Sequence, residues 1–325
     1  MKKIVPIEKF KPHEKFKEFQ KKYGAIPASD KKNEHLIKSR MLQGIYRNQN
    51  VYCNYILENS SFVNFMRNNQ LKKDAEKELI EIKKRERLTD EKRLFENLLS
   101  SQPMAFNIFL PLKWYEFSVG NSVFKELFPF LNIKHLVDIK LEYVPGDEKE
   151  KKDRIINIDN SCFDVYVEYK NNNDETGCIG IEVKYTEPFS QSDYWEETGY
   201  RKERYIKAIK EYSKQFFKKN EEKYLRPTYN QLFRNQLIVE EVKAKFNMDC
   251  ILAIVHSEGD VNCINTVAKF RKLIKLDNSC VSVSISQIVQ SAIKASANYP
   301  EMKSLYKDIY KRYCNYDLLN KFWEE

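Results

Sequence analysis

Two short segments near the middle of the chain, CFDVYVEY (residues 162–169) and IGIEVKY (residues 179–185), alternate apolar with polar side chains. Between them, residues 171–177 read NNNDETG, a composition that favours a tight turn. A strand, a turn and a second strand predict a β-hairpin. Because successive side chains of a strand point to opposite faces, Glu182 and Lys184 share one face and the apolar residues between and beside them share the other.

This hairpin brings an acid on one strand, Asp164, next to the acid and lysine of its neighbour. Metal-assisted hydrolysis of a phosphodiester needs hard oxygen ligands for Mg²⁺ or Mn²⁺, an activated water and a cation near the developing charge. Asp164 and Glu182 supply the oxygens, and the backbone carbonyl of Val183 is a further candidate ligand. Lys184 is the candidate for orienting or deprotonating the water, or for stabilising the transition state. Glu142 is an additional ligand or a neighbour that supports the ligands.

The alternative is a surface strand whose outer face carries a Glu–Lys pair, which would contribute little. Both strands are apolar on one face and the hairpin lies in the middle of the chain, so we expect central strands rather than an edge. The context therefore favours a nuclease-type site over a surface ion pair.

Outward from the hairpin, apolar periodicity predicts alternating strands and helices. The expected strands are 134–144, 161–170, 177–186 and 248–256, with 281–285 as an edge strand. The expected helices are 34–55, a helix or helix pair over 70–99, a restart at Pro103, and 197–219, 228–246 and 300–322. This order predicts an α/β protein with helices on the faces of a central sheet.

The helix predicted at 228–246 is apolar on two sides and also carries Gln231 and Asn235 on one of them. Such buried amides need partners, so they either brace the carboxylates of the site or cap strand ends in the core. Arg234 beside them is a candidate for gripping a phosphate oxygen. Gln102, in the helix that Pro103 restarts, is a candidate for a supporting position at the site.

Composition sets wider limits. The 325 residues carry a net charge of +9, which suits an anionic partner such as nucleic acid, although a Lys- and Asn-rich composition throughout the chain gives the same excess. The seven Cys form no CxxC pair and the four His show no zinc-type spacing. No signal peptide and no run of apolar residues long enough to cross a bilayer is visible, so we expect a soluble, cytoplasmic protein.

The acid-and-lysine pattern of the hairpin resembles that of the PD-(D/E)XK nuclease superfamily, the restriction-endonuclease-like proteins. The resemblance implies an αβββαβ core with a central mixed sheet flanked by helices, extended by helices at both ends. It places the first acid of the motif on Asp164, the second on Glu182 and the lysine on Lys184. One departure is Phe163, which stands where the motif has proline.

A narrower resemblance is to a bacterial family of restriction-endonuclease-like proteins. It covers roughly residues 35 to 260 and is carried by SRMLQGIYR (39–47), SSQPMAFN (100–107), LEY (141–143), IGIEVKYTEPF (179–189) and QLFRN (231–235).

Together these features predict a Mg²⁺-dependent DNA endonuclease in defence or DNA processing. The alternative is a catalytically silent module that binds nucleic acid or a protein partner and keeps the fold. The sequence leaves RNA and branched DNA open as substrates, and it favours a homodimer because a nuclease with one site needs two copies to cut both strands. The expected division is an N-terminal arm and helices (1–90), a nuclease core (91–290) and a C-terminal helix packed on the core (291–325).

Overall fold

The computed structural model describes residue 19 and residues 21–22, 33–50, 64–87, 89–148, 161–196, 200–216, 221–275 and 277–320. Its centre is a five-stranded mixed sheet in the order β1-β2-β3-β4-β5. The strands are β1 (Ile133–Tyr143), β2 (Phe163–Asn171), β3 (Thr176–Lys184), β4 (Asp249–His256) and β5 (Cys280–Ser284). β1, β2 and β3 are antiparallel neighbours, whereas β4 runs parallel to β3 and β5 runs parallel to β4. The predicted α/β fold is confirmed, and the predicted edge strand is β5.

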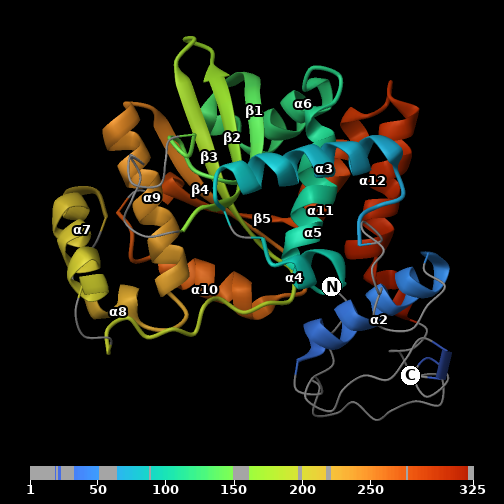
Figure 1. Ribbon diagram of the computed structural model, residues 1–325, viewed down its shortest axis with the longest axis horizontal. Helices are drawn as coiled ribbons and strands as arrows, with labels where there is room; N and C mark the ends of the chain where they lie inside the picture. The colour runs from blue at the N-terminus through green and yellow to red at the C-terminus, as the bar shows by residue number, and fades with distance from the viewer. Residues whose placement is uncertain are drawn as a thin grey trace.

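Helices cover both faces of this sheet (Figure 1). The described α-helices are α2 (Glu34–Asn50), α3 (Asn69–Lys84), α4 (Glu91–Phe95), α5 (Ser101–Phe109), α6 (Ser118–Leu127), α7 (Tyr200–Phe216), α8 (Glu221–Leu225), α9 (Asn230–Phe246), α10 (Val261–Arg271), α11 (Ile285–Ala295) and α12 (Pro300–Tyr313). Short 3₁₀ turns are η3 (Leu110–Lys113), η4 (Pro129–Leu131), η6 (Asp277–Ser279) and η7 (Tyr316–Leu319).

Two apolar clusters hold these layers to the sheet. Side chains of α3, α5, α6, α11 and α12 pack on one face, where β2 contributes Val165 and Val167. Side chains of α7, α8, α9 and α10 pack on the other face, where β4 contributes Leu252 and Ile254. Apolar burial on both faces accounts for the near-continuous apolar runs of β3 and β4, because both faces of a central strand are removed from water.

One of the two alternatives predicted for segment 70–99 is observed, and the last helix is shorter than predicted. The segment 70–99 is a helix pair, α3 and α4, and the chain leaves α3 at Arg85 and Glu86, where Glu86 has a φ of 51°. The last helix ends at Tyr313 rather than near residue 322, because the N–H groups of Cys314 and Asn315 both bond to the carbonyl of Tyr310 and close the helix.

Some expectations fall outside the described residues: most of the N-terminal arm, residues 51–55 of the first predicted helix, and the ends of the helix predicted at 197–219. Residue 290, where we expect the core to end, lies inside α11. The division into three parts stays a prediction.

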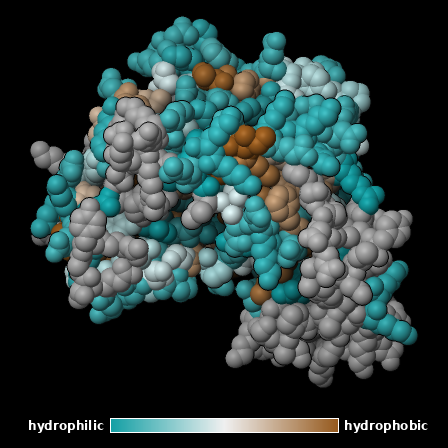
Figure 2. Space-filling model, in the orientation of Figure 1, coloured by the Kyte–Doolittle hydropathy of each residue, from teal (hydrophilic) through white to brown (hydrophobic). Residues whose placement is uncertain are grey.

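The face seen in Figure 2 is mostly hydrophilic, with apolar side chains confined to small patches. No helix among the described residues combines the length and apolar character needed to cross a membrane. Most of the buried apolar side chains of the described residues belong to the two clusters on the sheet.

Candidate active site

The candidate site lies where β2 and β3 separate. Their pairing ends with Val165 opposite Ile181. Beyond this pair the N–H of Val183 donates to Oδ2 of Asp164 at 2.7 Å, so a side chain replaces the missing main-chain partner. The carboxylate of Asp164 is thereby fixed against the strand that carries Glu182 and Lys184.

Phe163, the departure from the motif, has a packing role of its own. A Cβ placed on Gly180 would lie 2.3 Å from the ring of Phe163, so the ring occupies space that only glycine leaves free. This close approach anchors the start of β2 on β3 without proline, and Asp164 follows directly.

Glu182 and Lys184 are buried, with 3% and 6% of their surfaces exposed. β3 is the central strand of the sheet, and Nζ of Lys184 lies 3.0 Å from Oε1 of Glu182. The alternative of a solvated pair on an edge strand is therefore wrong. Burying two charges costs free energy unless other groups bond to them, so their further partners matter.

Helix α9 supplies those partners. Nε2 of Gln231 donates to Oε1 of Glu182 and Nδ2 of Asn235 donates to Oε2, both at 2.6 Å. The two amides are one helical turn apart, so one helix face reaches both oxygens of a single carboxylate. Of the two roles considered for these amides, the structure places them against the carboxylate.

Lys184 is held from three sides. Its ammonium group donates to Oε1 of Gln231 at 3.0 Å and lies 5.2 Å from the centre of the Phe189 ring. The same amide oxygen accepts the N–H of Ser190 at 3.1 Å, which fixes the orientation of Gln231. Burial alone would lower the pKa of Lys184, but the charges of Glu182 and Asp164 outweigh it and the pKa is raised.

Glu142 reaches the cluster from β1. The Cys162 thiol donates to its Oε2 at 3.3 Å, and the side chain of Gln102 also bonds to it. Burial raises the pKa of Glu142 to about 7, the charge of Glu182 adds to the rise, and the bonds from Cys162 and Gln102 oppose it. Glu142 also has a left-handed backbone, with a φ of 46°.

The cluster carries more acid than base. Burial, together with the charges of Glu182 and Glu142, raises the pKa of Asp164 well above its usual range. Three carboxyl groups therefore influence one another beside one lysine. Such an excess of acid is typical of a site built for a cation or for proton transfer, although ion-pair networks can also shift pKa values.

The donor set fits a hard divalent cation. Mg²⁺ is commonly held by one or two carboxylates and keeps several waters. Among the described residues no group of three or more His, Cys, Asp and Glu side chains is arranged to hold a metal by itself, so Asp164 and Glu182 would need water or uncharged oxygens to complete the shell. One such oxygen is present: Oε1 of Gln102 is buried and bonds to nothing in the described part of the chain.

Two further side chains, one of them the predicted phosphate contact Arg234, lie beside the cluster. Arg234 donates to Oγ of Ser161 at 3.1 Å and its guanidinium lies 5.5 Å from the centre of the Tyr194 ring, so its role toward phosphate stays a prediction. Burial raises the pKa of the Cys162 thiol well above its usual range, which fits an inert thiol.

Sequence reasoning missed the surroundings of the lysine. His256 is the partner of Lys184 in the β3–β4 register, and its Nε2 lies 2.7 Å from Oγ of Ser282 on β5. Phe189 and Ser190 come from the loop directly after the motif strand. The sequence offered one signal for Phe189 and Ser190, namely that their loop directly follows the strand with Glu182 and Lys184. None of these residues shows a spacing typical of a site.

Comparison with known proteins adds one finding. A family model described as the PD-(D/E)XK nuclease superfamily matches residues 31–315. Searches of curated proteins and of solved structures return no match. The match spans every described strand and includes the cluster of Asp164, Glu182 and Lys184, whereas the narrower bacterial family stays a prediction.

Proposed function

Because the chain belongs to the PD-(D/E)XK nuclease superfamily, we propose that it is a metal-dependent endonuclease that hydrolyses phosphodiester bonds in DNA. The observation that carries the proposal is the buried contact of Lys184 with Glu182, 3.0 Å long, beside Asp164 at the point where β2 and β3 separate. Two acids and a lysine in a place that a surface ion pair would not occupy are the groups that this chemistry requires.

Asp164, Glu182 and the carbonyl oxygen of Val183 are the proposed ligands of Mg²⁺ or Mn²⁺. When bound, such a cation polarises the scissile phosphate and lowers the pKa of an attacking water. Lys184 donates to Glu182 and Gln231 and so enters the reaction as a cation, placed to stabilise charge that develops on the phosphate.

The remaining residues hold these groups in position. Gln231 and Asn235 fix both oxygens of Glu182, which leaves the carboxylate little freedom to rotate. Gln102 and Glu142 support the side of the cluster nearest β1, and Arg234 is the proposed contact to a phosphate beside the scissile one.

Plasmid cleavage tests the proposal. Supercoiled plasmid and single-stranded circles are incubated with Mg²⁺, Mn²⁺ or EDTA, using the wild-type protein and Lys184→Ala. Lys294→Ala is the matched control, because Lys294 is an exposed lysine on α11 that pairs with Glu126. We expect cleavage that requires the metal and Lys184 but not Lys294.

The cleavage products also indicate how many strands are cut and which type of nucleic acid is the substrate. Linear plasmid would support a homodimer that cuts both strands, and nicked circles would support a monomer. Cleavage confined to single-stranded circles, or to RNA or branched DNA added in parallel, would change the proposed substrate. No cleavage with either metal would favour a silent binding module.

A further inference from the structure

The main chain of β1 is distorted at the residue that faces the candidate site. Glu142 has a φ of 46°, in the left-handed region that residues other than glycine rarely adopt. A strand would not take this conformation on its own, so neighbouring groups must hold it. Those groups contact the chain on both sides of Glu142 and come from α3, from the residues after it and from the turn after β1.

The first contact is at Leu141, one residue before Glu142. β1 is an edge strand, and the main-chain groups of Leu141 bond to side chains of α3 and the residue after it instead of a sixth strand. The N–H of Leu141 donates to Oε1 of Glu78 at 3.0 Å, and its carbonyl accepts from Nη2 of Arg85 at 2.9 Å. Arg85 also lies 3.2 Å from the same oxygen of Glu78.

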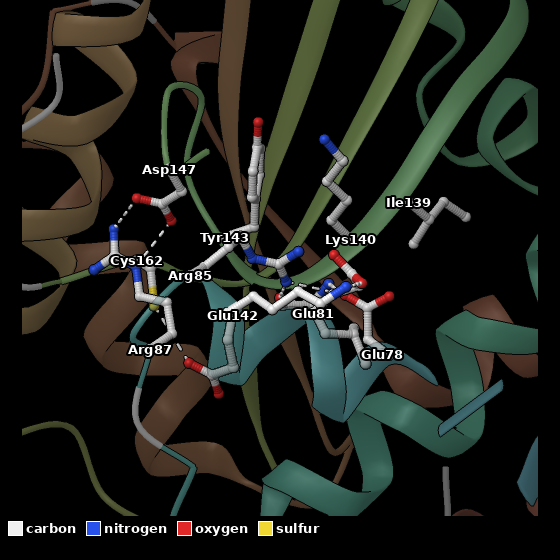
Figure 3. Close-up of polar contacts among 12 residues, drawn as sticks. Glu78, Glu81, Arg85, Arg87, Ile139, Lys140, Glu142, Tyr143, Asp147 and Cys162 are labelled. Carbon is white, nitrogen blue, oxygen red and sulfur yellow. Dashed lines mark hydrogen bonds and ion pairs between the residues drawn. The ribbon is translucent and has the colours of Figure 1, made fainter. Parts of the chain in front are cut away.

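The second contact is at Val144, two residues after Glu142. Its N–H donates to Oδ2 of Asp147 at 3.1 Å. Arg87 holds Asp147 through two bonds, from Nε to Oδ2 at 2.8 Å and from Nη2 to Oδ1 at 2.6 Å. Figure 3 shows these two bonds, and Glu142 extending away from Asp147 toward Cys162.

These four residues, Glu78, Arg85, Arg87 and Asp147, form two ion pairs that we call the β1 clamp. All four are buried. Bidentate arginine–carboxylate contacts are geometrically specific, so the contact between Arg87 and Asp147 fixes the relative orientation of the two side chains as well as their distance. The clamp pins the chain on either side of one residue, and only that residue is left-handed between Ile133 and Val144.

We propose that Arg85 and Arg87 are positioning residues of the active site. By holding Leu141 and Val144, they fix the left-handed backbone of Glu142 and so place its carboxylate beside Asp164 and Glu182. The inference rests on the proposed function in one respect, that this cluster binds a divalent cation. Neither arginine contacts the cation or the substrate.

Manganese binding to the full-length protein tests this without relying on cleavage. Mn²⁺ is titrated into metal-free wild-type protein, Arg85→Lys and Arg87→Lys, and free Mn²⁺ is followed by electron paramagnetic resonance. Lysine keeps the charge but loses the planar set of donors of the guanidinium, and in Arg87→Lys also the bidentate contact with Asp147. We expect Kd for Mn²⁺ to rise by roughly tenfold in each variant, the usual lower range for residues that position metal ligands.

The matched control is Lys113→Met. Lys113 also donates to a β1 carbonyl, that of Ile139, at 2.8 Å, and pairs with Asp138 at 3.0 Å, but it acts before the distorted residue. Kd should stay unchanged in this variant. A merely structural role for the arginines would lower the number of binding sites per chain, as unfolded protein accumulates, and would leave Kd of the folded fraction unchanged.

If a lysine variant does not fold, Glu78→Gln and Asp147→Asn replace it, since each keeps an oxygen acceptor for the main-chain N–H. Their Kd should also rise. If the wild-type protein binds Mn²⁺ and every clamp variant binds it with the same Kd, only the positioning role is overturned. Absence of Mn²⁺ binding in the wild-type protein would overturn both this inference and the metal-dependent function.

Discussion

The site cluster and the β1 clamp are neighbouring groups of buried charges, but acids and bases are balanced in the clamp whereas acids are in excess in the site cluster. In the clamp each acid faces an arginine: Glu78 pairs with Arg85, and Asp147 pairs with Arg87. In the site cluster Lys184 pairs with Glu182 and its charge also acts on Asp164, while Glu142 adds a third carboxyl group. Uncharged amides supply the other contacts to Glu182.

This difference separates structure from function. A balanced pair satisfies its own charges and gains geometric precision, whereas an acid-rich cluster has an excess of negative charge that a bound cation would offset. We therefore expect substitutions in the clamp to reduce stability as well as to disturb the position of Glu142, and substitutions in the site cluster to reduce mainly the reaction rate. Each substitution below tests one side of that division.

The largest effect is expected for cleavage by Lys184→Met. The variant removes the one cation of the site cluster, and loss of a single group that stabilises a transition state typically costs about 10²–10³-fold in rate. Glu182 keeps its bonds from Gln231 and Asn235 in this variant, so the melting temperature should fall less than in Arg87→Met. Single-turnover plasmid cleavage, with Lys294→Met alongside, measures the loss. If Lys184→Met unfolds instead, Lys184 is needed for stability, as the clamp residues are.

For the clamp, Arg87→Met should destabilise the protein by about 3–5 kcal/mol, because it removes the cation that faces the buried carboxylate of Asp147. The double variant Arg87→Met with Asp147→Leu should recover part of this loss, since no unpaired charge remains. Urea unfolding of both variants measures the free energies. A double variant as unstable as the single one would show that the arginine acts through packing and not through the pair.

A smaller effect on cleavage is expected for the amides of α9. Gln231→Leu removes a donor to Glu182 and an acceptor from Lys184, so cleavage should fall by about 10–100-fold. Gln236→Leu is the control on the same helix, because Gln236 bonds to Glu240 and not to the site. Cleavage rates of the two variants at saturating Mg²⁺ measure these losses. Equal losses in both variants would assign Gln231 to folding of the helix.

Sequence periodicity predicted the site cluster better than the clamp, for a physical reason. Asp164, Glu182 and Lys184 lie on paired strands, so strand alternation and one hairpin bring them together. Alternation also indicated the five strands to within two residues. The site also needed no long-range information beyond the packing of one helix, α9, on the sheet.

The clamp could not be predicted in this way. Arg85 contacts Leu141, 56 positions away, and Arg87 contacts Asp147, 60 positions away. No periodic pattern in the sequence relates positions so far apart. The left-handed conformation of Glu142 has no signal in LEY (141–143), because Glu is not a residue that favours it. In the same way, periodicity continued the last helix beyond Tyr313, since only the main-chain bonds at its end show where it closes.

The smallest expected effect is a gain in stability from Asp164→Asn. Asparagine keeps an oxygen for the N–H of Val183 but removes one of three interacting acids, so metal-free protein should gain up to about 1 kcal/mol. Glu182→Gln should lose stability, because its new NH₂ group faces the donors Asn235 or Gln231. The changes in stability caused by Asp164→Asn and Glu182→Gln should therefore have opposite signs. Thermal unfolding with and without Mg²⁺ measures this, and added Mg²⁺ should stabilise the wild-type protein but not Asp164→Asn. Stabilisation of the variant by Mg²⁺ would place the cation elsewhere, and a destabilised metal-free variant would make Asp164 a structural acid like those of the clamp.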